Sequence, residues 1–245
     1  LDRDNHLPLY IQLKNLMEEK IEAKEWEPGT VIPSEKELQE QFDVSRITVR
    51  QAVNELVNEG LVVKKQGKGT YVSFPKISHD LPNLTSFTED IESKGLEPKS
   101  EILTIKRTKN QAIAEKLNTD KDTTLLNIKR LRLINDEKIG VHNCYLNTNL
   151  LTEDKLTDLE EMTGKDSLYE VIEQDNNLKI NYADETLEGG IADEKISDLL
   201  DIQKKFPLLI LERITFTEEE EPIEYVKMHY RADKYKYSIR LNRNS

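Results

Sequence analysis

The stretch SRITVRQAVNELVNEGLVVKKQGKGTYV, residues 45–72, changes its hydrophobic period part-way along and so predicts a helix followed by a β-hairpin. Ser45 is suited to cap the N-terminus of that helix, and Gly60 is suited to end it. Beyond Gly60 the apolar residues alternate, and Gly67 and Gly69 allow a tight turn between two strands. The apolar stripe of the helix consists of Val49, Ala52, Val53, Leu56 and Val57.

This stretch is basic although the chain as a whole is acidic. The 245-residue chain has a formal net charge of -12 and a pI near 5.0, which alone would argue against a nucleic-acid partner. Salt screens charges beyond about 8 Å, however, so distant acidic surface matters little when cations gather on one face. The cations of the stretch are Arg46, Arg50, Lys64, Lys65 and Lys68, against only Glu55 and Glu59.

Two further helices are predicted ahead of residue 45. The first starts near Pro8 and ends before Pro28 and Gly29, and the second opens with a capping box formed by Ser34 and Glu37. A short turn then leads into the third helix. Two helices joined by a tight turn and followed by a hairpin predict a winged helix-turn-helix, whose last helix enters the major groove of DNA.

The polar side of the third helix carries residue types that read DNA. Arg46, Thr48, Arg50 and Gln51 lie off the apolar stripe and face outward together. Arginine reads guanine, glutamine reads adenine, and hydroxyls hold phosphates. A wing tip with Lys68 between two glycines can approach the DNA backbone or minor groove closely. Each feature alone also fits an ordinary solvated surface, but their order along the chain favours DNA binding.

Residues 7–73 resemble the winged helix-turn-helix domain of GntR-family bacterial transcription regulators, in the segments LPLYIQLKNLMEEKI and PGTVIPSEKELQEQFDVSRITVRQAVNELVNEGLVVKKQGKGTYV. The chain differs from the family at Lys36, where the family often has arginine. The lysine offers a point charge in place of the bidentate guanidinium fork. The candidate DNA-binding residues, from the resemblance and from the two elements themselves, are Lys36, Ser45, Arg46, Thr48, Arg50, Gln51, Gly67, Lys68 and Gly69.

The chain is expected to contain two domains. Residues 1–73 form the winged domain, residues 74–83, with two prolines and no periodicity, form a linker, and residues 84–245 form a second domain. Mixed strands and helices in that domain predict an α+β fold around an antiparallel sheet, so the fold class is α+β. The expected strands are 101–108, 124–134, 138–146, 181–191, 208–216 and 222–231, and the expected helices are 86–95, 110–118, 167–176 and 193–202.

Two features of the second domain could bind an anion. Arg130 and Arg132 share one strand face and could clamp a phosphate or carboxylate, unless that face is simply exposed. The segment TSFTED, residues 85–90, could start a helix whose amides bind an anion. Ser86 and Glu89 form a capping box there, however, which could satisfy the helix end without a ligand.

A third feature is a carboxylate among apolar neighbours. Glu224 shares a strand face with Val226, Met228 and Tyr230. Because a carboxylate in such a place is costly unless it is paired, Glu224 either accepts from a hydroxyl of a sugar or forms a structural salt bridge.

About residues 84–243, from LTSFTEDIESKGLEP to EPIEYVKMHYRADKYKYSI, resemble the effector-binding UTRA domain of the HutC subfamily, which implies a chorismate-lyase-like fold. Members of this subfamily commonly sense phosphorylated sugars or amino sugars, and some sense other small metabolites. The resemblance implies nine candidate effector-binding residues, which are Ser86, Phe87, Thr88, Arg130, Arg132, Ser167, Tyr169, Glu224 and Tyr230. His142 is a tenth candidate because of the place where it stands in its strand.

His142 and Asn147 depart from the pattern of the phosphosugar-sensing relatives, which tend to carry glutamate and proline at these places. A neutral imidazole offers one donor and one acceptor where a carboxylate only accepts. His142 is therefore either a ligand contact with a different hydroxyl preference or a satisfied structural histidine.

Composition limits the remaining classes. With 36% hydrophobic and 33% charged residues, no long apolar run and no signal-peptide pattern, the chain is expected to be soluble and cytoplasmic. The single cysteine, Cys144, excludes an internal disulfide and a cysteine-based zinc site. The four histidines lack metal spacing, and no nucleophile motif or phosphate loop is present. We therefore expect no metal, no cofactor and no enzymatic activity.

The expected function is that of a bacterial transcriptional repressor. A homodimer would bind double-stranded, palindromic operator DNA under the control of a small-molecule effector, a phosphorylated sugar or amino sugar, with no membrane partner. The alternatives are a regulator of a non-sugar metabolite and a DNA-binding protein whose C-terminal domain only dimerises.

Overall fold

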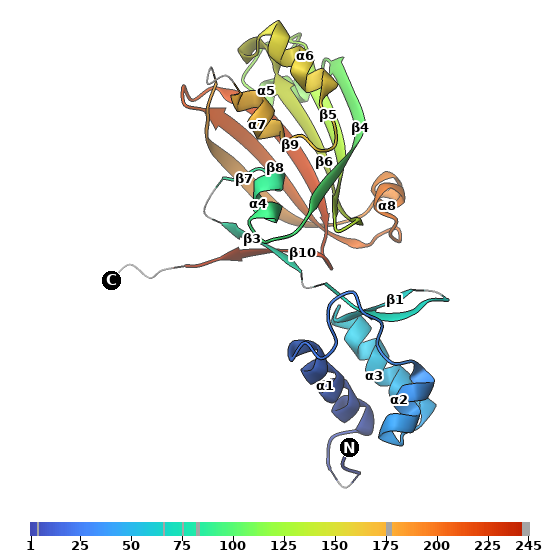
Figure 1. Cartoon of the computed structure of the whole chain (residues 1–245). Coiled ribbons are helices and arrows are strands. Elements are labelled where there is room, and N and C mark those ends of the chain that lie inside the picture. Colours follow the sequence, from blue (N-terminus) through green and yellow to red (C-terminus); the bar gives the residue numbers. More distant parts are fainter. Residues whose placement is uncertain (4, 66, 75, 82–83, 175–177, 242–245) are drawn as a thin grey trace. The chain divides into compact units, whose positions relative to one another are not determined.

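The computed structural model describes residues 1–3, 5–65, 67–74, 76–81, 84–174 and 178–241 and divides into two compact units. The first unit is Leu1–Lys76 and the second is Ile77–Ser245 (Figure 1). The domain bounds expected from the sequence, 1–73 and 84–245, stay a prediction. Within the described residues, no helix is both long and apolar enough to cross a membrane.

The first unit is a three-helix bundle with a hairpin. Its elements are the helices α1 (Leu9–Glu22), α2 (Glu35–Phe42) and α3 (Arg46–Asn58) and the antiparallel strands β1 (Val62–Lys65) and β2 (Gly69–Val72). Leu13, Met17, Leu38 and Leu56 are completely buried where the helices meet. The winged helix-turn-helix is therefore confirmed in both its order and its core.

Local signals set the ends of the two helices that form the motif. The expected capping box is present at α2, where the Ser34 amide donates to Glu37 Oε2 at 2.7 Å and the Glu37 amide donates to Ser34 Oγ at 3.3 Å. Asp43, with φ 50°, ends α2 in the left-handed conformation. Ser45 then accepts from the Thr48 amide at 3.2 Å and starts α3.

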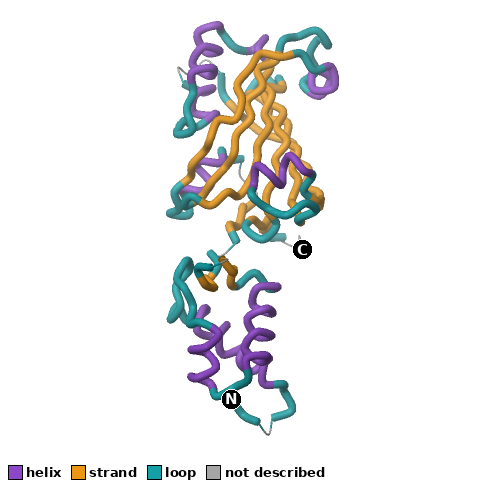
Figure 2. The backbone as a smooth tube through the Cα atoms, turned by 90° about the vertical axis from the view of Figure 1, so that its right-hand side faces the viewer, coloured by secondary structure: helices purple, strands orange, loops and turns teal. Residues whose placement is uncertain are grey.

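The second unit is an α+β unit built on one antiparallel six-stranded sheet, which confirms the expected fold class (Figures 1 and 2). The strand order is β4-β5-β6-β9-β8-β7. The strands are β4 (Pro98–Thr108), β5 (Leu125–Ile134), β6 (Glu137–Asn147), β7 (Ile180–Ile191), β8 (Pro207–Thr217) and β9 (Pro222–Arg231). The helices are α4 (Phe87–Glu92), α5 (Gln111–Lys116), α6 (Glu153–Glu161), α7 (Leu168–Glu173) and α8 (Glu194–Leu200), with a 3₁₀ turn at Thr148–Leu150.

The helices cover the two faces of the sheet unequally. The largest core cluster joins α4, α6 and α7 to one face, with Ile91, Leu159 and Ile172 among its buried residues. On the other face α5 and α8 pack over opposite ends of the sheet, through Leu117 and Leu200. The face under α4 and α7 is the one that holds the candidate site.

Three elements were not expected from the sequence. The predicted linker, residues 74–83, contains the strand β3 (Ile77–Leu81), which pairs in parallel with β10 (Tyr235–Ile239). The helix α6 also lay outside the expected elements. β3 forms by pairing with β10, which comes from the far end of the unit. Local periodicity in the sequence therefore does not indicate it. Of the expected helix 167–176, the last two residues lie outside the described part of the chain.

Gly164 fixes the loop between α6 and α7 against β4. A Cβ atom at this glycine would lie 1.8 Å from the backbone oxygen of Ser100, which is far inside van der Waals contact. We expect Gly164→Ala to lower the free energy of unfolding by about 1–3 kcal/mol, because a backbone segment must move to admit the methyl group. Urea unfolding measures this loss. Gly189→Ala, at a glycine with open space around it, is the matched control, and equal midpoints for the two variants would contradict the contact.

Candidate functional site

The first turns of α3 present the expected DNA-reading residues outward. Arg46, Arg50 and Gln51 are exposed, and Thr48 is half-buried beside the cap of Ser45, to whose hydroxyl it lies 2.9 Å away. Arg46 Nε lies 3.5 Å from Glu35 Oε2, so its side chain bends toward α2. The helix thus offers a polar face whose cations are held only by exposed, weak ion pairs.

Lys36 and the wing complete this surface. Lys36 is exposed on α2, where it lies 3.8 Å from Glu40. Gly67 and Gly69 have φ of 70° and 120°, and such positive angles at the hairpin tip favour glycine. Lys68 between them is exposed. The candidate DNA-binding residues of α2, α3 and the wing therefore lie on the surface of one unit.

Ile47 belongs to the same surface but was not a candidate from the sequence. Its side chain is 72% exposed between Arg46 and Thr48 at the start of α3. An isoleucine in this position has no core to contact, and an apolar side chain in the major groove contacts the methyl group of thymine. The sequence did carry a signal for Ile47, because this residue lies off the apolar stripe of α3, next to Arg46 and Thr48.

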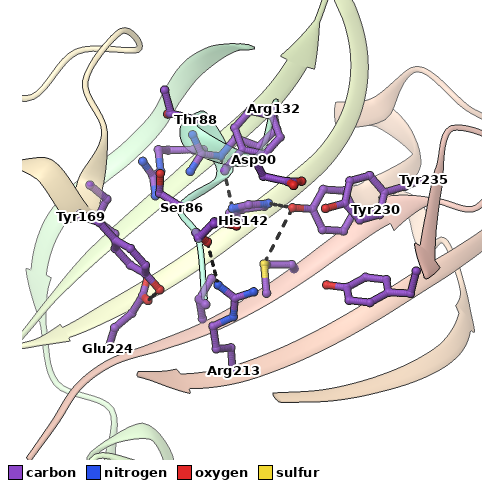
Figure 3. A pocket seen from close by; sticks show the side chains of 17 residues that line it. Ser86, Thr88, Asp90, Arg132, His142, Tyr169, Arg213, Glu224, Tyr230 and Tyr235 are labelled. Atoms are coloured by element: carbon purple, nitrogen blue, oxygen red, sulfur yellow. Dashed lines mark hydrogen bonds between the residues drawn. The ribbon is translucent and has the colours of Figure 1, made fainter. Parts of the chain in front are cut away.

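The second unit contains a cavity between α4, α7 and the covered face of the sheet (Figure 3). Its volume is about 530 Å³ when the open solvent at its mouth is included. Nine of the ten candidate effector-binding residues line it. The lining residues are Thr85, Ser86, Phe87, Thr88, Asp90, Arg130, Arg132, His142, Leu168, Tyr169, Arg213, Glu224, Val226, Met228, Tyr230, Tyr235 and Tyr237.

Arg130 and Arg132 are buried side chains of β5 that reach this cavity from below α4. Each is only 3% exposed, so the alternative of an exposed charged strand face is wrong. The Nε and Nη1 atoms of Arg130 have no hydrogen-bond partner among the described residues. Arg132 is held by Ser100, to whose hydroxyl its Nη1 donates at 2.5 Å, and lies 4.6 Å from the centre of the Phe87 ring.

The electrostatics of this arginine pair favour an anion. Burial lowers the pKa of Arg130, and burial together with the nearby Arg130 charge holds the pKa of Arg132 well below its usual range. Both shifts express the cost of keeping two like charges away from water. An anion placed between the guanidinium groups would relieve that cost and fill the donors that Arg130 leaves unused.

His142 is engaged by protein groups on both ring nitrogens. Arg132 Nε donates to His142 Nδ1 at 3.2 Å, and His142 Nε2 lies 2.7 Å from the Tyr230 hydroxyl (Figure 3). Because arginine can only donate, Nδ1 must be the acceptor. Burial and the adjacent arginines hold the pKa of His142 well below its usual range, so the neutral ring carries its proton on Nε2. His142 therefore orients Arg132 and Tyr230.

The depressed pKa of His142 makes stability depend on pH. The unfolded chain takes up a proton at this residue as the pH falls below about 6.5, whereas the folded chain does not, so the free energy of unfolding falls toward acid pH by up to about 1.4 kcal/mol per unit. We expect His142→Gln to remove this contribution. Urea unfolding at pH 7.5 and 5.5 measures how much the free energy of unfolding changes with pH in each protein. His229→Gln tests a second histidine, whose pKa burial also lowers. Parallel slopes for the wild type and His142→Gln would refute the neutral buried state.

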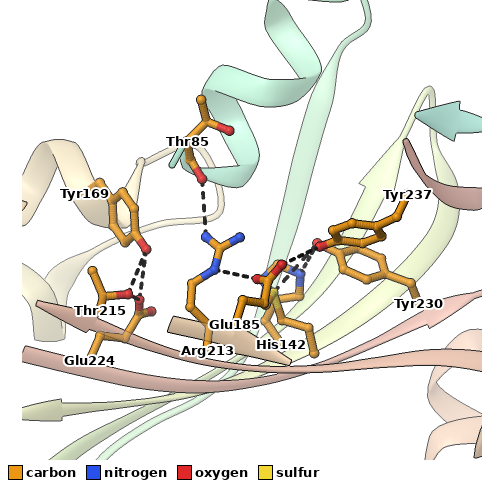
Figure 4. A network of polar contacts seen from close by, with 10 residues as sticks. Thr85, His142, Tyr169, Glu185, Arg213, Thr215, Glu224, Tyr230 and Tyr237 are labelled. Carbon is orange, nitrogen blue, oxygen red and sulfur yellow. Dashed lines mark hydrogen bonds and ion pairs between the residues drawn. The ribbon is translucent and has the colours of Figure 1, made fainter. Parts of the chain in front are cut away.

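Glu224 is a buried carboxylate held by two hydroxyls. Its Oε2 atom accepts from the Tyr169 hydroxyl at 3.1 Å and from the Thr215 hydroxyl at 3.0 Å, and its side chain faces the cavity (Figure 4). No lysine or arginine forms a salt bridge with it among the described residues, so of the two expected readings the structural salt bridge is wrong. Burial raises the pKa of Tyr169, so this phenol stays a donor.

Arg213 is a third cavity arginine, which sequence reasoning missed. Its Nε donates to Glu185 Oε2 at 2.6 Å and its Nη1 to the Thr85 carbonyl at 3.4 Å (Figure 4). The Tyr237 hydroxyl donates to Glu185 Oε1 at 3.1 Å. Unlike Arg130, this arginine is neutralised by a carboxylate of the neighbouring strand. Little in the sequence indicated Arg213, because its partner Glu185 is set by the pairing of β7 with β8.

Ser86 and Ser167 have local roles that the sequence indicated in part. The capping box of α4 is present, since the Ser86 amide donates to Glu89 Oε2 at 3.0 Å and the Glu89 amide donates to Ser86 Oγ at 3.2 Å. The helix end is therefore satisfied by its own side chains. Ser167 caps α7 and donates to Ser86 Oγ at 3.5 Å, and it lies beside the lining residues rather than among them.

The charges of the lining leave a cationic surplus. Arg213 is paired with Glu185, and Asp90 is paired with Lys94. Of the described lining residues, Glu224 is then the one carboxylate left to face Arg130 and Arg132. No group of three metal-ligating side chains occurs among the described residues. The chain thus joins a winged helix-turn-helix with an exposed basic helix face to a unit whose cavity carries a cationic surplus, an arrangement suited to a DNA-binding protein that responds to an anionic ligand.

Comparison with known proteins gives the family. Residues 9–72 match the family of bacterial regulatory proteins named gntR, and residues 93–236 match the UTRA domain. The chain is 34% identical over 246 residues to the HTH-type transcriptional repressor NagR of Bacillus subtilis (strain 168), covering 100% of this chain and 99% of that protein. This protein therefore belongs to the GntR family, in its HutC subfamily with a UTRA domain, which is a family of regulators and not of enzymes.

Two further similarities extend over nearly the whole chain. The Mannosyl-D-glycerate transport/metabolism system repressor MngR of Escherichia coli (strain K12) is 28% identical over 98% of both proteins. The crystal structure of PhnF from Mycobacterium smegmatis has a TM-score of 0.65 at 23% identity, covering 97% of this chain and 100% of that one, and so shows the shared fold. DNA binding thus falls to the winged unit and effector binding to the UTRA unit.

Proposed function

We propose that this protein is a transcriptional repressor that binds a palindromic operator as a homodimer and responds to a phosphorylated sugar or amino sugar. The supporting observation is the buried pair Arg130 and Arg132, in which two nitrogen atoms of Arg130 find no hydrogen-bond partner within the part of the chain that the structure describes. Repressors NagR and MngR are related along the whole chain, which supports the sign of regulation.

Each part of the cavity has a role in this proposal. Arg130 and Arg132, with Ser86, Phe87 and Thr88 above them, hold the phosphate. Glu224 accepts from a hydroxyl group of the sugar, beside Tyr169 and Tyr230. His142 acts through Arg132 and Tyr230 rather than on the ligand, because both of its nitrogens are engaged.

The winged unit supplies the DNA contacts of the proposal. One α3 helix reads too few base pairs for a specific operator, whereas two helices related by a two-fold axis read a palindrome. Within each half-site, Arg46, Thr48, Arg50 and Gln51 face the bases and nearby phosphates, and Lys36 and the wing tip, residues 67–69, face the backbone or minor groove.

A thermal-shift panel tests the effector class. Matched pairs of sugars and amino sugars, with and without a phosphate, are added to the purified full-length protein. A ligand at about 100 times its dissociation constant should add about 2.7 kcal/mol to the free energy of unfolding. Stabilisation by phosphorylated members alone supports the proposal. Stabilisation by neither member of any pair would refute a sugar effector and favour a non-sugar metabolite or a domain that only dimerises.

A further inference from the structure

Ile47 is an apolar residue that the first unit leaves in solvent. It is 72% exposed, more than any other large apolar residue that the structure describes in this unit. Among the described residues it belongs neither to the core cluster of the unit nor to the partly buried side chains packed against that cluster. Its β-branched side chain also loses rotamer freedom in a helix. Within the unit itself, isoleucine thus brings no structural benefit at this position.

The place of Ile47 on α3 aligns it with the DNA-reading residues and the wing. Arg50 and Gln51 follow it by three and four residues, and Asn54 follows it by seven, so these side chains lie on one face of the helix. All of them are exposed. Asn54 accepts from Lys64 Nζ of β1 at 2.8 Å, so this face runs on to the wing. Because the last helix of the motif enters the major groove, Ile47 lies on the side that approaches the bases.

The polar residues on this face of α3 cannot recognise a methyl group. Guanidinium and amide groups read bases through hydrogen bonds, whereas an aliphatic side chain makes none. In the major groove a 5-methyl group marks thymine among the four bases, and it is read by apolar contact. Ile47 therefore adds a kind of recognition that Arg50, Gln51 and Asn54 lack.

We propose that Ile47 packs against the 5-methyl group of one thymine in each half-site of the operator. Residues three or four apart on a helix lie about 5–6 Å from each other, and neighbouring base pairs lie about 3.4 Å apart. The thymine is therefore about one or two base pairs away from the base that Arg50 or Gln51 reads. The inference deepens the operator binding of the proposed function and rests on it.

Binding-site selection with the full-length protein locates this thymine. Randomised duplex DNA is enriched in parallel by the wild type and by Ile47→Ala, whose exposed position should leave the urea unfolding midpoint unchanged. We expect the same half-site from both proteins except at one position, where the wild type selects thymine and Ile47→Ala shows no preference. That position should lie within about two base pairs of one that Arg50→Ala no longer specifies.

Deoxyuridine in place of that thymine removes the methyl group and keeps the base pair. Wild-type affinity, measured by anisotropy, should fall about fourfold when one half-site is changed and about fifteenfold when both are changed, since one methyl contact is lost each time. Ile47→Ala should bind the thymine and deoxyuridine duplexes equally. Leu7→Ala shortens another exposed apolar side chain of the same unit, and as the matched control it should show the wild-type loss.

Two outcomes would contradict the inference in different ways. Equal losses for the wild type and Ile47→Ala at the deoxyuridine, or no loss for the wild type at any thymine of the selected site, would overturn the methyl contact and leave operator binding standing. A wild-type protein that enriches no DNA sequence would overturn the operator binding of the proposed function and this inference together.

Discussion

Arg132→Ala is expected to abolish the response to effector while operator binding persists. Arg132 is 3% exposed and its guanidinium group stands beside that of Arg130, so an anionic ligand would lose a buried, charge-assisted contact. Losing hydrogen bonds to a charged group costs about 3 kcal/mol, which corresponds to effector binding weakened at least about a hundredfold. Isothermal titration with the effector that the thermal-shift panel selects measures this loss, and anisotropy with operator DNA checks that repression survives.

Two further variants sharpen this experiment. Arg132→Lys keeps the charge but not the planar fork, so it should bind more weakly than the wild type and more tightly than Arg132→Ala. Arg107→Ala removes an arginine from β4 that pairs with Glu153 and Glu160 on α6, outside the cavity, and should leave effector affinity unchanged. An Arg132→Ala protein that still responds to effector at the wild-type concentration would remove Arg132 from the site.

Arg46→Ala and Arg50→Ala are each expected to weaken operator binding strongly while leaving the effector cavity intact. Loss of one base-reading arginine costs about 1–3 kcal/mol, and a symmetric operator loses the contact in both half-sites, so the total is about 2–6 kcal/mol. Anisotropy titrations with labelled operator at fixed salt measure the change.

The control for these two variants is another cation of the same unit. Lys20 on α1 pairs with Glu25, away from the α3 surface, so Lys20→Ala should bind operator as the wild type does. Effector binding should stay unchanged in all three variants, because the cavity lies in the other unit. Unchanged operator affinity in both arginine variants would mean that α3 is not the recognition helix.

The winged unit could be predicted almost completely because its signals are local. Capping residues, a helical apolar stripe and two glycines with positive φ each act within a few residues of the chain. The alternation of β5 likewise indicated which face carries Arg130 and Arg132. It could not show that this face is buried, because burial depends on α4 and α7, which come from distant parts of the sequence.

What the sequence could not show depends on pairing over long distances. β3 and β10 come from opposite ends of their unit, and five residues are too few to reveal a periodicity. The place of Arg213 in the cavity depends on the pairing of β7 with β8, which sets Glu185 opposite it. The role of His142 could not be decided either, because it depends on which partners its two nitrogens meet.

The strand β5 carries two kinds of residue in alternation. Arg130 and Arg132 face the cavity, while Leu131 and Leu133 pack on the opposite face beneath α8. The loss or gain of a single residue in this strand would exchange the two sets, sending leucines into the cavity and arginines into an apolar core. In the proposed function, the same few residues of β5 thus serve both ligand recognition and folding. This segment can then evolve by substitution but hardly by insertion or deletion.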